Sequence, residues 1–576
     1  MSEIFLIKNF IYFIPSLNDL LSFFLLLLLT ISFCSYGQII SNIGSSFNFF
    51  IGWSFFYFVI LLLNFYLGIN LNVIISTFIL IGLFYAYKNF DRNFFINFFK
   101  ENKILTFFSI IYLFLLISSN TKEWDSFAFW GLNINYLIEH GFFPLADNQF
   151  KHVHGNNPQT FGASFIVYTA SMFNDNLSEN SSAIFNFISL FMFFLILKKN
   201  FINSNNQYFL ILLIFLNPFI INSKTFSLYN DFSISIVISV IYIFLFKQLF
   251  FKKEGQFFND KRFWISLFLL FNLLYLIKST GFVNLIIFIF VTSILLLYEK
   301  KSNDLIKLLL IFVITISFFF LFKYILGIDS NYSFFRNSIR INLLDEILLS
   351  SIFNFLSNKI YVLFYILIFI LFLSNLFTKK LSNDTIFIFL TLIFWLGFII
   401  FSYLVFFVKS EAINAHSFNR YLSQINMLIL TYAIISYNNL SINYKIVEKF
   451  FSSKVILYIS ILTVLVTPIL ISDKLRRDLQ YPLVNITNLN KLLNFKDYKN
   501  IFVVTDNRAY ISHVLKFYSN KSKFSIYDNK SENIPILEKI FKEFDLILYI
   551  TKGNSCYIDS NYENRNKNRC NNSLLQ

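Results

Sequence analysis

Apolar runs of membrane-spanning length recur along most of the chain, and short polar loops separate them. Each run has about 16 to 24 residues, enough to cross the hydrocarbon core of a bilayer as a helix. The runs lie near residues 17–35, 48–67, 72–88, 104–119, 181–198, 207–222, 231–247, 263–278, 281–298, 305–326, 359–377, 384–407, 421–438 and 453–472. We therefore predict an all-α polytopic membrane domain of about fourteen transmembrane helices over residues 1–472.

The chain becomes polar after the last apolar run. NIFVVTD, KFSIYD and DLILYI have the alternation and β-branched content of strands, whereas RAYISHVLKFYS and IPILEKIFKEF have helical periodicity. The order strand, helix, strand, helix, strand predicts a small α/β domain over residues 473–576.

Composition and charge agree with a membrane location. Hydrophobic residues make up 56% of the chain and charged residues only 14%, which excludes an ordinary water-soluble protein of this size. The net charge of +15 comes from Lys and Arg in the loops between spans rather than on one amphipathic face, so we expect no nucleic-acid partner. The basic loops all follow odd-numbered spans, which orients both termini outside the cytoplasm. We expect a multi-pass protein of the bacterial inner membrane with an extracytoplasmic C-terminal domain.

The longest polar loop among the spans, within residues 120–180, is extracytoplasmic on this topology. Its candidate functional side chains are Trp124, Asp125, Trp130, His152 and His154. A carboxylate here can remove a proton from an acceptor hydroxyl or hold a divalent cation. The histidines can bind metal, acceptor or phosphate. The alternative is that Asp125 is an interfacial residue beside an aromatic belt.

Further ionisable residues stand at span ends on the same predicted face. Lys224 and Asp231 bracket the loop SKTFSLYND, Lys278 closes a span in LIKSTGF, and Arg420 opens one in HSFNRYL. The positive-inside rule would place Lys278 and Arg420 on the other face, so an anionic ligand at this depth is one explanation. A polyprenyl phosphate is such a ligand, because its charge lies at the surface and its tail lies in the lipid. Snorkelling to the headgroups is the alternative.

Five segments together resemble the GT-C superfamily of membrane glycosyltransferases, which use polyprenyl-phosphate sugars, especially the bacterial relatives of the dolichyl-phosphate-mannose and aminoarabinose transferases. The segments are EWDSFAFWGLNINYLIEHGFFP, KHVHGNNPQTFGASF, SLYNDFSIS, LIKSTGF and NRYLSQINMLIL. The resemblance implies Asp125 as catalytic base or metal ligand and Asp231 as a supporting acid. It also implies Lys278 and Arg420 as contacts of the donor phosphate. The chain carries EWD rather than an adjacent Asp-Glu pair, and it lacks Tyr-Pro beside the histidines, so the metal and the acceptor stay open.

The resulting expectation is an extracytoplasmic glycosyltransferase. It would move a sugar from a polyprenyl-phosphate carrier to a lipid, glycan or protein acceptor. Asp125 and Asp231 would be catalytic and could hold Mg²⁺ or Mn²⁺. The expected acceptor or substrate contacts are Trp124, Trp130, His152, His154 and Lys224.

Two other functions fit a many-spanned protein. In an O-antigen polymerase or ligase, the functional residues would instead be Arg336 and Arg340 in SNYSFFRNSIRINLLDE. A transporter or flippase would use internal repeats and broken spans. Pro218 and Gly397 interrupt spans, but the sequence has no internal repeat or matching pair of broken helices.

The two cysteines of the polar tail raise a separate question. In an oxidising compartment Cys556 and Cys570 could pair, and the alternative is two free thiols.

Overall fold

The computed structural model describes most of the chain. The described residues are 8–41, 45–89, 102–121, 130–143, 162–173, 177–178, 180–201, 224–226, 228, 230–250, 260–325, 339–378, 382–443, 454–506, 508–518, 522–528, 543–551 and 554–559.

Helices dominate residues 8–475. The α-helices are α2 (Leu17–Ile40), α3 (Ser45–Ile60), α4 (Leu71–Lys88), α6 (Lys103–Ile117), α7 (Gly131–His140), α9 (Ser164–Ser171), α10 (Asn180–Phe201), α13 (Asp231–Leu249), α14 (Asp260–Ile277), α15 (Thr280–Tyr298), α16 (Ser302–Ile325), α17 (Leu344–Ser357), α18 (Lys359–Thr378), α19 (Asn383–Val405), α20 (Lys409–Ile413), α21 (Phe418–Ser423), α22 (Asn426–Asn443) and α24 (Lys454–Leu475). Short 3₁₀ or π turns are η1 (Phe10–Phe13), η2 (Leu61–Tyr66), η5 (Lys224–Phe226) and η6 (Ile341–Leu343).

Eight helices of the described residues are long and apolar enough to cross a membrane, or nine if one bent pair counts as a single span. The prediction of about fourteen spans is therefore not confirmed. α6 has only 15 residues, fewer than the roughly 20 that a span needs. α14 begins with the charged residues Asp260, Lys261 and Arg262. The predicted span 207–222 lies outside the described residues. The prediction treated every apolar run as one helix that crosses the membrane. Some of these runs form helices that are too short to do so.

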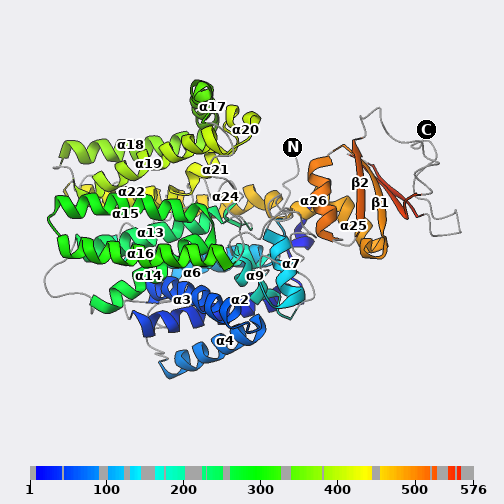
Figure 1. Cartoon of the computed structure of the whole chain (residues 1–576), viewed down its shortest axis with the longest axis horizontal. Helices are drawn as coiled ribbons and strands as arrows, with labels where there is room; N and C mark the ends of the chain where they lie inside the picture. Colours follow the sequence, from blue (N-terminus) through cyan, green and yellow to red (C-terminus); the bar gives the residue numbers. More distant parts are fainter. Residues whose placement is uncertain are drawn as a thin grey trace.

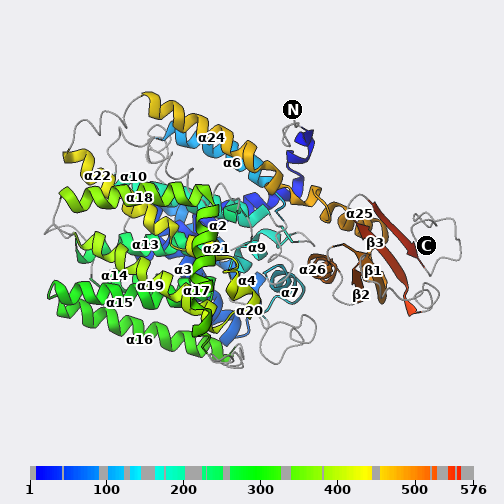
Figure 2. The same cartoon turned by 90° about the horizontal axis from the view of Figure 1, so that it is seen from above.

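The long helices pack into a bundle, which Figures 1 and 2 show from two directions. α13 lies inside it against α10, α14 and α22, and its side chains from Phe232 to Phe246 are buried. The sequence of α13 is rich in Ile and Val, which are only moderate helix formers. In a membrane it is helical nevertheless, because a helix satisfies its own backbone hydrogen bonds.

Local sequence explains how the first helices begin and pack. Ser16 and Asp19 form a reciprocal capping box at the start of α2, with Ser16 N donating to the Asp19 carboxylate over 2.9 Å. α3 approaches α2 closely at Gly52, where an added Cβ would lie 1.9 Å from the carbonyl oxygen of Phe33. Small residues allow such close helix contacts in membranes.

The C-terminal domain is α/β, as predicted. Its sheet has the order β2-β1-β3-β4, in which β1 (Asn500–Thr505) pairs in parallel with β2 (Lys523–Asp528) and β3 (Leu546–Thr551). The antiparallel strand β4 (Asn554–Asp559) was not predicted. α25 (Leu483–Leu493) and α26 (Arg508–Tyr518) pack on the sheet through one buried apolar cluster. The predicted helix IPILEKIFKEF lies almost entirely outside the described residues.

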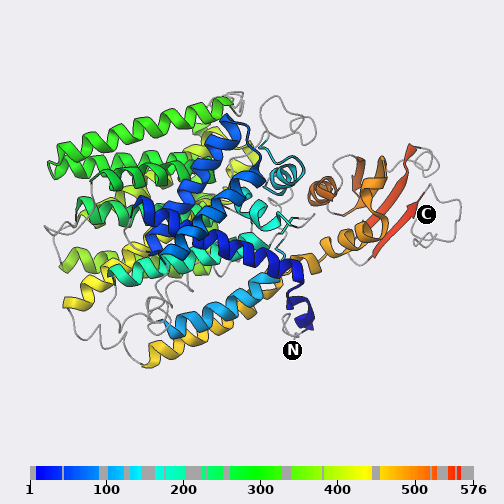
Figure 3. The ribbon, with the colours of Figure 1, turned by 90° about the horizontal axis from the view of Figure 1, so that it is seen from below.

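The C-terminal domain projects from one end of the bundle, as Figure 3 shows. α24 leads into it and packs beside α6, where Tyr112 Oη donates to the carbonyl oxygen of Val464 over 3.1 Å. At the junction Asn120 N donates to the carbonyl oxygen of Leu475 over 2.7 Å. α7, α9, α17 and α20 lie at this same end of the bundle (Figures 1 and 2), which we call the domain end.

Candidate functional site

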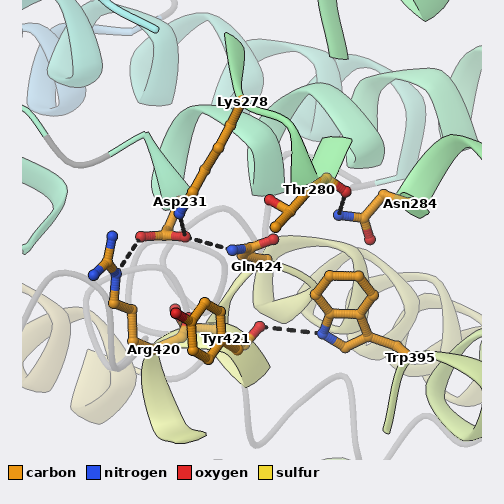
Figure 4. Close-up of polar contacts among 9 residues, drawn as sticks. Asp231, Lys278, Thr280, Asn284, Trp395, Arg420, Tyr421 and Gln424 are labelled. Carbon is orange, nitrogen blue, oxygen red and sulfur yellow. Dashed lines mark hydrogen bonds and ion pairs between the residues drawn. The ribbon is translucent and has the colours of Figure 1, made fainter. Parts of the chain in front are cut away.

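Three residues that are far apart in the sequence meet at the domain end, where Asp231 pairs with both Lys278 and Arg420 (Figure 4). Asp231 is the first residue of α13, Lys278 directly follows α14, and Arg420 lies in α21. Lys278 Nζ is 2.6 Å from Asp231 Oδ1, and Arg420 Nε is 2.8 Å from Asp231 Oδ2. We call these three residues the cationic cluster. The sequence predicted all three for one site, and the structure brings them into contact.

The three side chains of the cationic cluster add up to a formal charge of +1, because Lys278 and Arg420 both pair with Asp231. The Asp231 side chain is only 3% exposed, whereas those of Lys278 and Arg420 are 13% and 15% exposed. A buried carboxylate needs such partners, since an unpaired charge is costly away from water. The helix N-terminus of α13 adds a further favourable field for Asp231. The cations retain some access to a ligand.

Gln424 completes the surroundings of Asp231, and the sequence reasoning missed it. Its Nε2 donates to Asp231 Oδ1, while its fully buried Oε1 has no partner among the described residues. The hydroxyl of Thr280, two residues after Lys278, is also buried without a partner in the described structure. The position of Gln424, four residues after Arg420, was the available signal, because residues at this spacing can share one side of a helical segment.

Neighbouring helices hold the segment that carries Arg420. Trp395 Nε1 in α19 donates to the carbonyl oxygen of Tyr421 over 3.1 Å (Figure 4). Tyr361 Oη in α18 donates to the carbonyl oxygen of Asn419 over 3.0 Å. Tyr403 Oη donates to the carbonyl oxygen of His416 over 2.6 Å. Several helices thus fix the backbone on both sides of Arg420.

Trp130 and Gly162, two positions within the predicted outer loop, lie close to residues that adjoin the cationic cluster. Gly162 N donates to the carbonyl oxygen of Leu276, near the end of α14, over 3.3 Å. A Cβ at Gly162 would lie 2.2 Å from Nδ2 of Asn230, the residue before Asp231, and 2.8 Å from the ring of Trp130. Gly162 therefore lies between Trp130 and the residue that precedes Asp231, a set of contacts that we call the loop anchor.

The remaining candidates of the outer loop are only partly described. Trp124, Asp125, His152 and His154 lie outside the described residues. Trp130 is 5% exposed and belongs to a small buried apolar cluster of the loop anchor. This packing gives Trp130 a structural role, and its contact with an acceptor stays a prediction.

The structure describes only part of Lys224 and only one of the two arginines of the polymerase alternative. Lys224 begins η5, and its side chain is outside the described part of the structure. Arg336 is also outside it. Arg340 Nη1 donates to the carbonyl oxygen of Phe407 over 2.9 Å. This hydrogen bond holds the backbone after α19 in place.

The surroundings of Asp231 do not suit a divalent cation. Its carboxylate oxygens accept from Lys278, Arg420 and Gln424, and two of these donors carry positive charge that would repel a metal. The described residues contain no group of three or more His, Cys, Asp or Glu side chains that could hold a metal ion. A metal role for Asp231 is thus disfavoured, and one for Asp125 stays a prediction.

In the C-terminal domain, Cys556 of β4 is disulfide-bonded. Cys34 in α2 is a free thiol, and Cys570 lies outside the described residues.

Comparison with known proteins gives no match: no family model, curated protein or solved structure is similar to this chain.

Proposed function

We propose that the protein is a membrane glycosyltransferase that moves a sugar from a polyprenyl-phosphate carrier to a lipid, glycan or protein acceptor outside the cytoplasm. The observation that carries the proposal is the cationic cluster. Lys278, directly after α14, and Arg420 of α21 converge on Asp231 at one end of the membrane bundle, and the three side chains add up to a formal charge of +1. Such a cluster suits an anionic headgroup whose hydrocarbon tail remains in the bilayer.

The proposed reaction needs a base, a phosphate site and an aligned acceptor. The acceptor hydroxyl attacks the anomeric carbon, and the bond between that carbon and the phosphate oxygen breaks. The bonding electrons leave with the polyprenyl phosphate, and Asp125 takes the hydroxyl proton. Lys278 and Arg420 stabilise the negative charge that develops on the departing phosphate.

Asp231 acts in this proposal as a positioning residue. Its oxygens already accept hydrogen bonds from both cations and from Gln424, so it is poorly placed to take a proton from substrate. By pairing with Lys278 and Arg420 it holds the two cations together. This revises the expected role of Asp231 as a supporting acid while keeping it in the site.

The test is turnover of a radiolabelled polyprenyl-phosphate sugar by the purified full chain in lipid nanodiscs supplied with membrane acceptors. The proposal requires labelled acceptor and released polyprenyl phosphate in equal amounts. Release of neither product across a panel of hexose and pentose donors would overturn it.

A further inference from the structure

Helix α17 runs across the membrane bundle rather than along it. It has 14 residues, which corresponds to roughly 21 Å, shorter than the bilayer core. A bend of 92° separates it from α18, with only Asn358 between them. α17 lies at the domain end of the bundle and crosses the direction of α18 and α19 (Figures 1 and 2).

One side of this crossing segment is apolar and exposed. Its exposed apolar side chains are Ile341, Leu348, Leu349, Ile352, Phe353 and Leu356, with exposed fractions from 39% to 72%. The charged residues Asp345 and Glu346, in the first turn of α17, are exposed as well. The spacing of three, four and seven positions places them on one helical face. On the other side Leu343, Ile347 and Ser351 are buried. An exposed apolar face on a helix requires a covering partner.

We infer that α17 lies in the boundary between lipid headgroups and hydrocarbon, with its exposed apolar face covered by lipid chains. Its depth follows from α18, which begins two residues after α17 ends. α18 continues the same exposed apolar surface at Leu363, Ile366 and Phe369. A short amphipathic helix perpendicular to a span, at the end of that span, has the geometry of an interfacial helix.

α17 is also tied to the chain segment that carries Arg420. Asn354 Nδ2 donates to the carbonyl oxygens of Asn414 and Ala415 over 2.9 and 3.1 Å. In return, Asn419 Nδ2 donates to the carbonyl oxygen of Asn354 over 2.8 Å. A helix held at the lipid boundary thereby fixes the depth of Arg420 at the level of lipid phosphates. This surface and its depth do not depend on sugar transfer.

The depth is measurable with nitroxide labels on the full chain in phosphatidylcholine and phosphatidylglycerol vesicles, in a Cys34→Ser background. Leu349→Cys is the test position. Leu363→Cys in α18 is the lipid-exposed control, and Lys496→Cys in the C-terminal domain is the aqueous control. We expect the label at 349 to be relaxed more by oxygen than by a polar nickel complex, as at 363. A water-like profile as at 496, or protection from both reagents by a protein partner, would contradict the inference.

The coupling to Arg420 has its own test. A nitroxide at the exposed position of His416 should become more mobile and change depth in the Asn354→Leu variant, because the two hydrogen bonds from Asn354 Nδ2 to the carbonyl oxygens of Asn414 and Ala415 are lost. Asn342→Leu is the matched control, since it makes the same exchange in η6 without an observed hydrogen bond. An unchanged label at 416 in Asn354→Leu would separate α17 from the Arg420 segment.

Discussion

At the scale of single residues, the site combines two cations with one buried carboxylate among the described side chains. Asp231 pairs with both cations, and the formal charge of +1 on these three side chains is the basis for proposing an anionic ligand. Each cation donates to the carboxylate on one side and remains partly exposed. Substitution of each cation can show whether it binds a ligand or only forms a structural ion pair with Asp231.

Lys278→Met and Arg420→Met should each weaken binding of the polyprenyl-phosphate donor by about tenfold or more, because a charge-assisted hydrogen bond contributes about 1.5–3 kcal/mol. Titration of a labelled donor into nanodiscs measures this. Lys409→Met is the control, since Lys409 is an exposed cation in α20 at the same end of the bundle. Equal losses in all three variants would indicate a nonspecific surface-charge effect.

Asp231→Asn and Asp125→Asn should separate positioning from proton transfer. Removing the Asp231 charge leaves two cations facing each other, so thermal stability should fall, by about 3–5 kcal/mol if the pair is typical of buried ones. Asp125→Asn should abolish transfer while the melting temperature stays near that of the wild type. Thermal unfolding and turnover are measured on the same samples.

The polymerase alternative makes the opposite assignment. Loss of product in Arg336→Ala with normal turnover in Asp125→Asn would support the polymerase or ligase function, with its functional arginine in the segment after α16.

At the scale of elements, neighbouring side chains pack tightly against Gly162 in the loop anchor. Its φ of +53° and its contact with Asn230 both exclude a side chain. The loop anchor joins the start of α9 to the start of α13 and the end of α14, so it couples Gly162 to the residues beside the cationic cluster.

Gly162→Ala should therefore destabilise the protein by about 1–2 kcal/mol for the left-handed backbone alone, and more for the contact with Asn230. Donor binding should weaken as the loop end shifts. Gly397→Ala in α19 is the matched control, because its added Cβ meets nothing within 4 Å, and helix propensity predicts a small gain. Thermal unfolding should show opposite signs for the two variants.

At the scale of the whole molecule, α7, α17 and the C-terminal domain share one end of the bundle (Figure 1). The loop charges predict that this end faces away from the cytoplasm. Spheroplasts treated with a membrane-impermeant maleimide should label Lys496→Cys and leave Lys88→Cys at the end of α4 unlabelled, in a Cys34→Ser background. The reverse pattern would invert the topology and place the cationic cluster on the cytoplasmic side.

The sequence predicted the class of the fold better than its count of spans. Apolar runs identify helices well, because the bilayer forces each backbone to satisfy its own hydrogen bonds. They do not say whether a helix such as α6 is long enough to cross, or that α17 turns by 92° before α18. The antiparallel strand β4 was missed because its sequence, NSCYID, is short and partly polar.

The sequence by itself determined that this is a helical membrane protein with an α/β C-terminal domain, because the hydrophobic period and composition are local properties of the chain. It also identified Asp231, Lys278 and Arg420 as costly residues at span ends. Only the tertiary structure decided that they touch, and that Gln424 joins them. These contacts join positions separated by 47, 189 and 193 residues. Helix packing, which no local pattern specifies, brings them together.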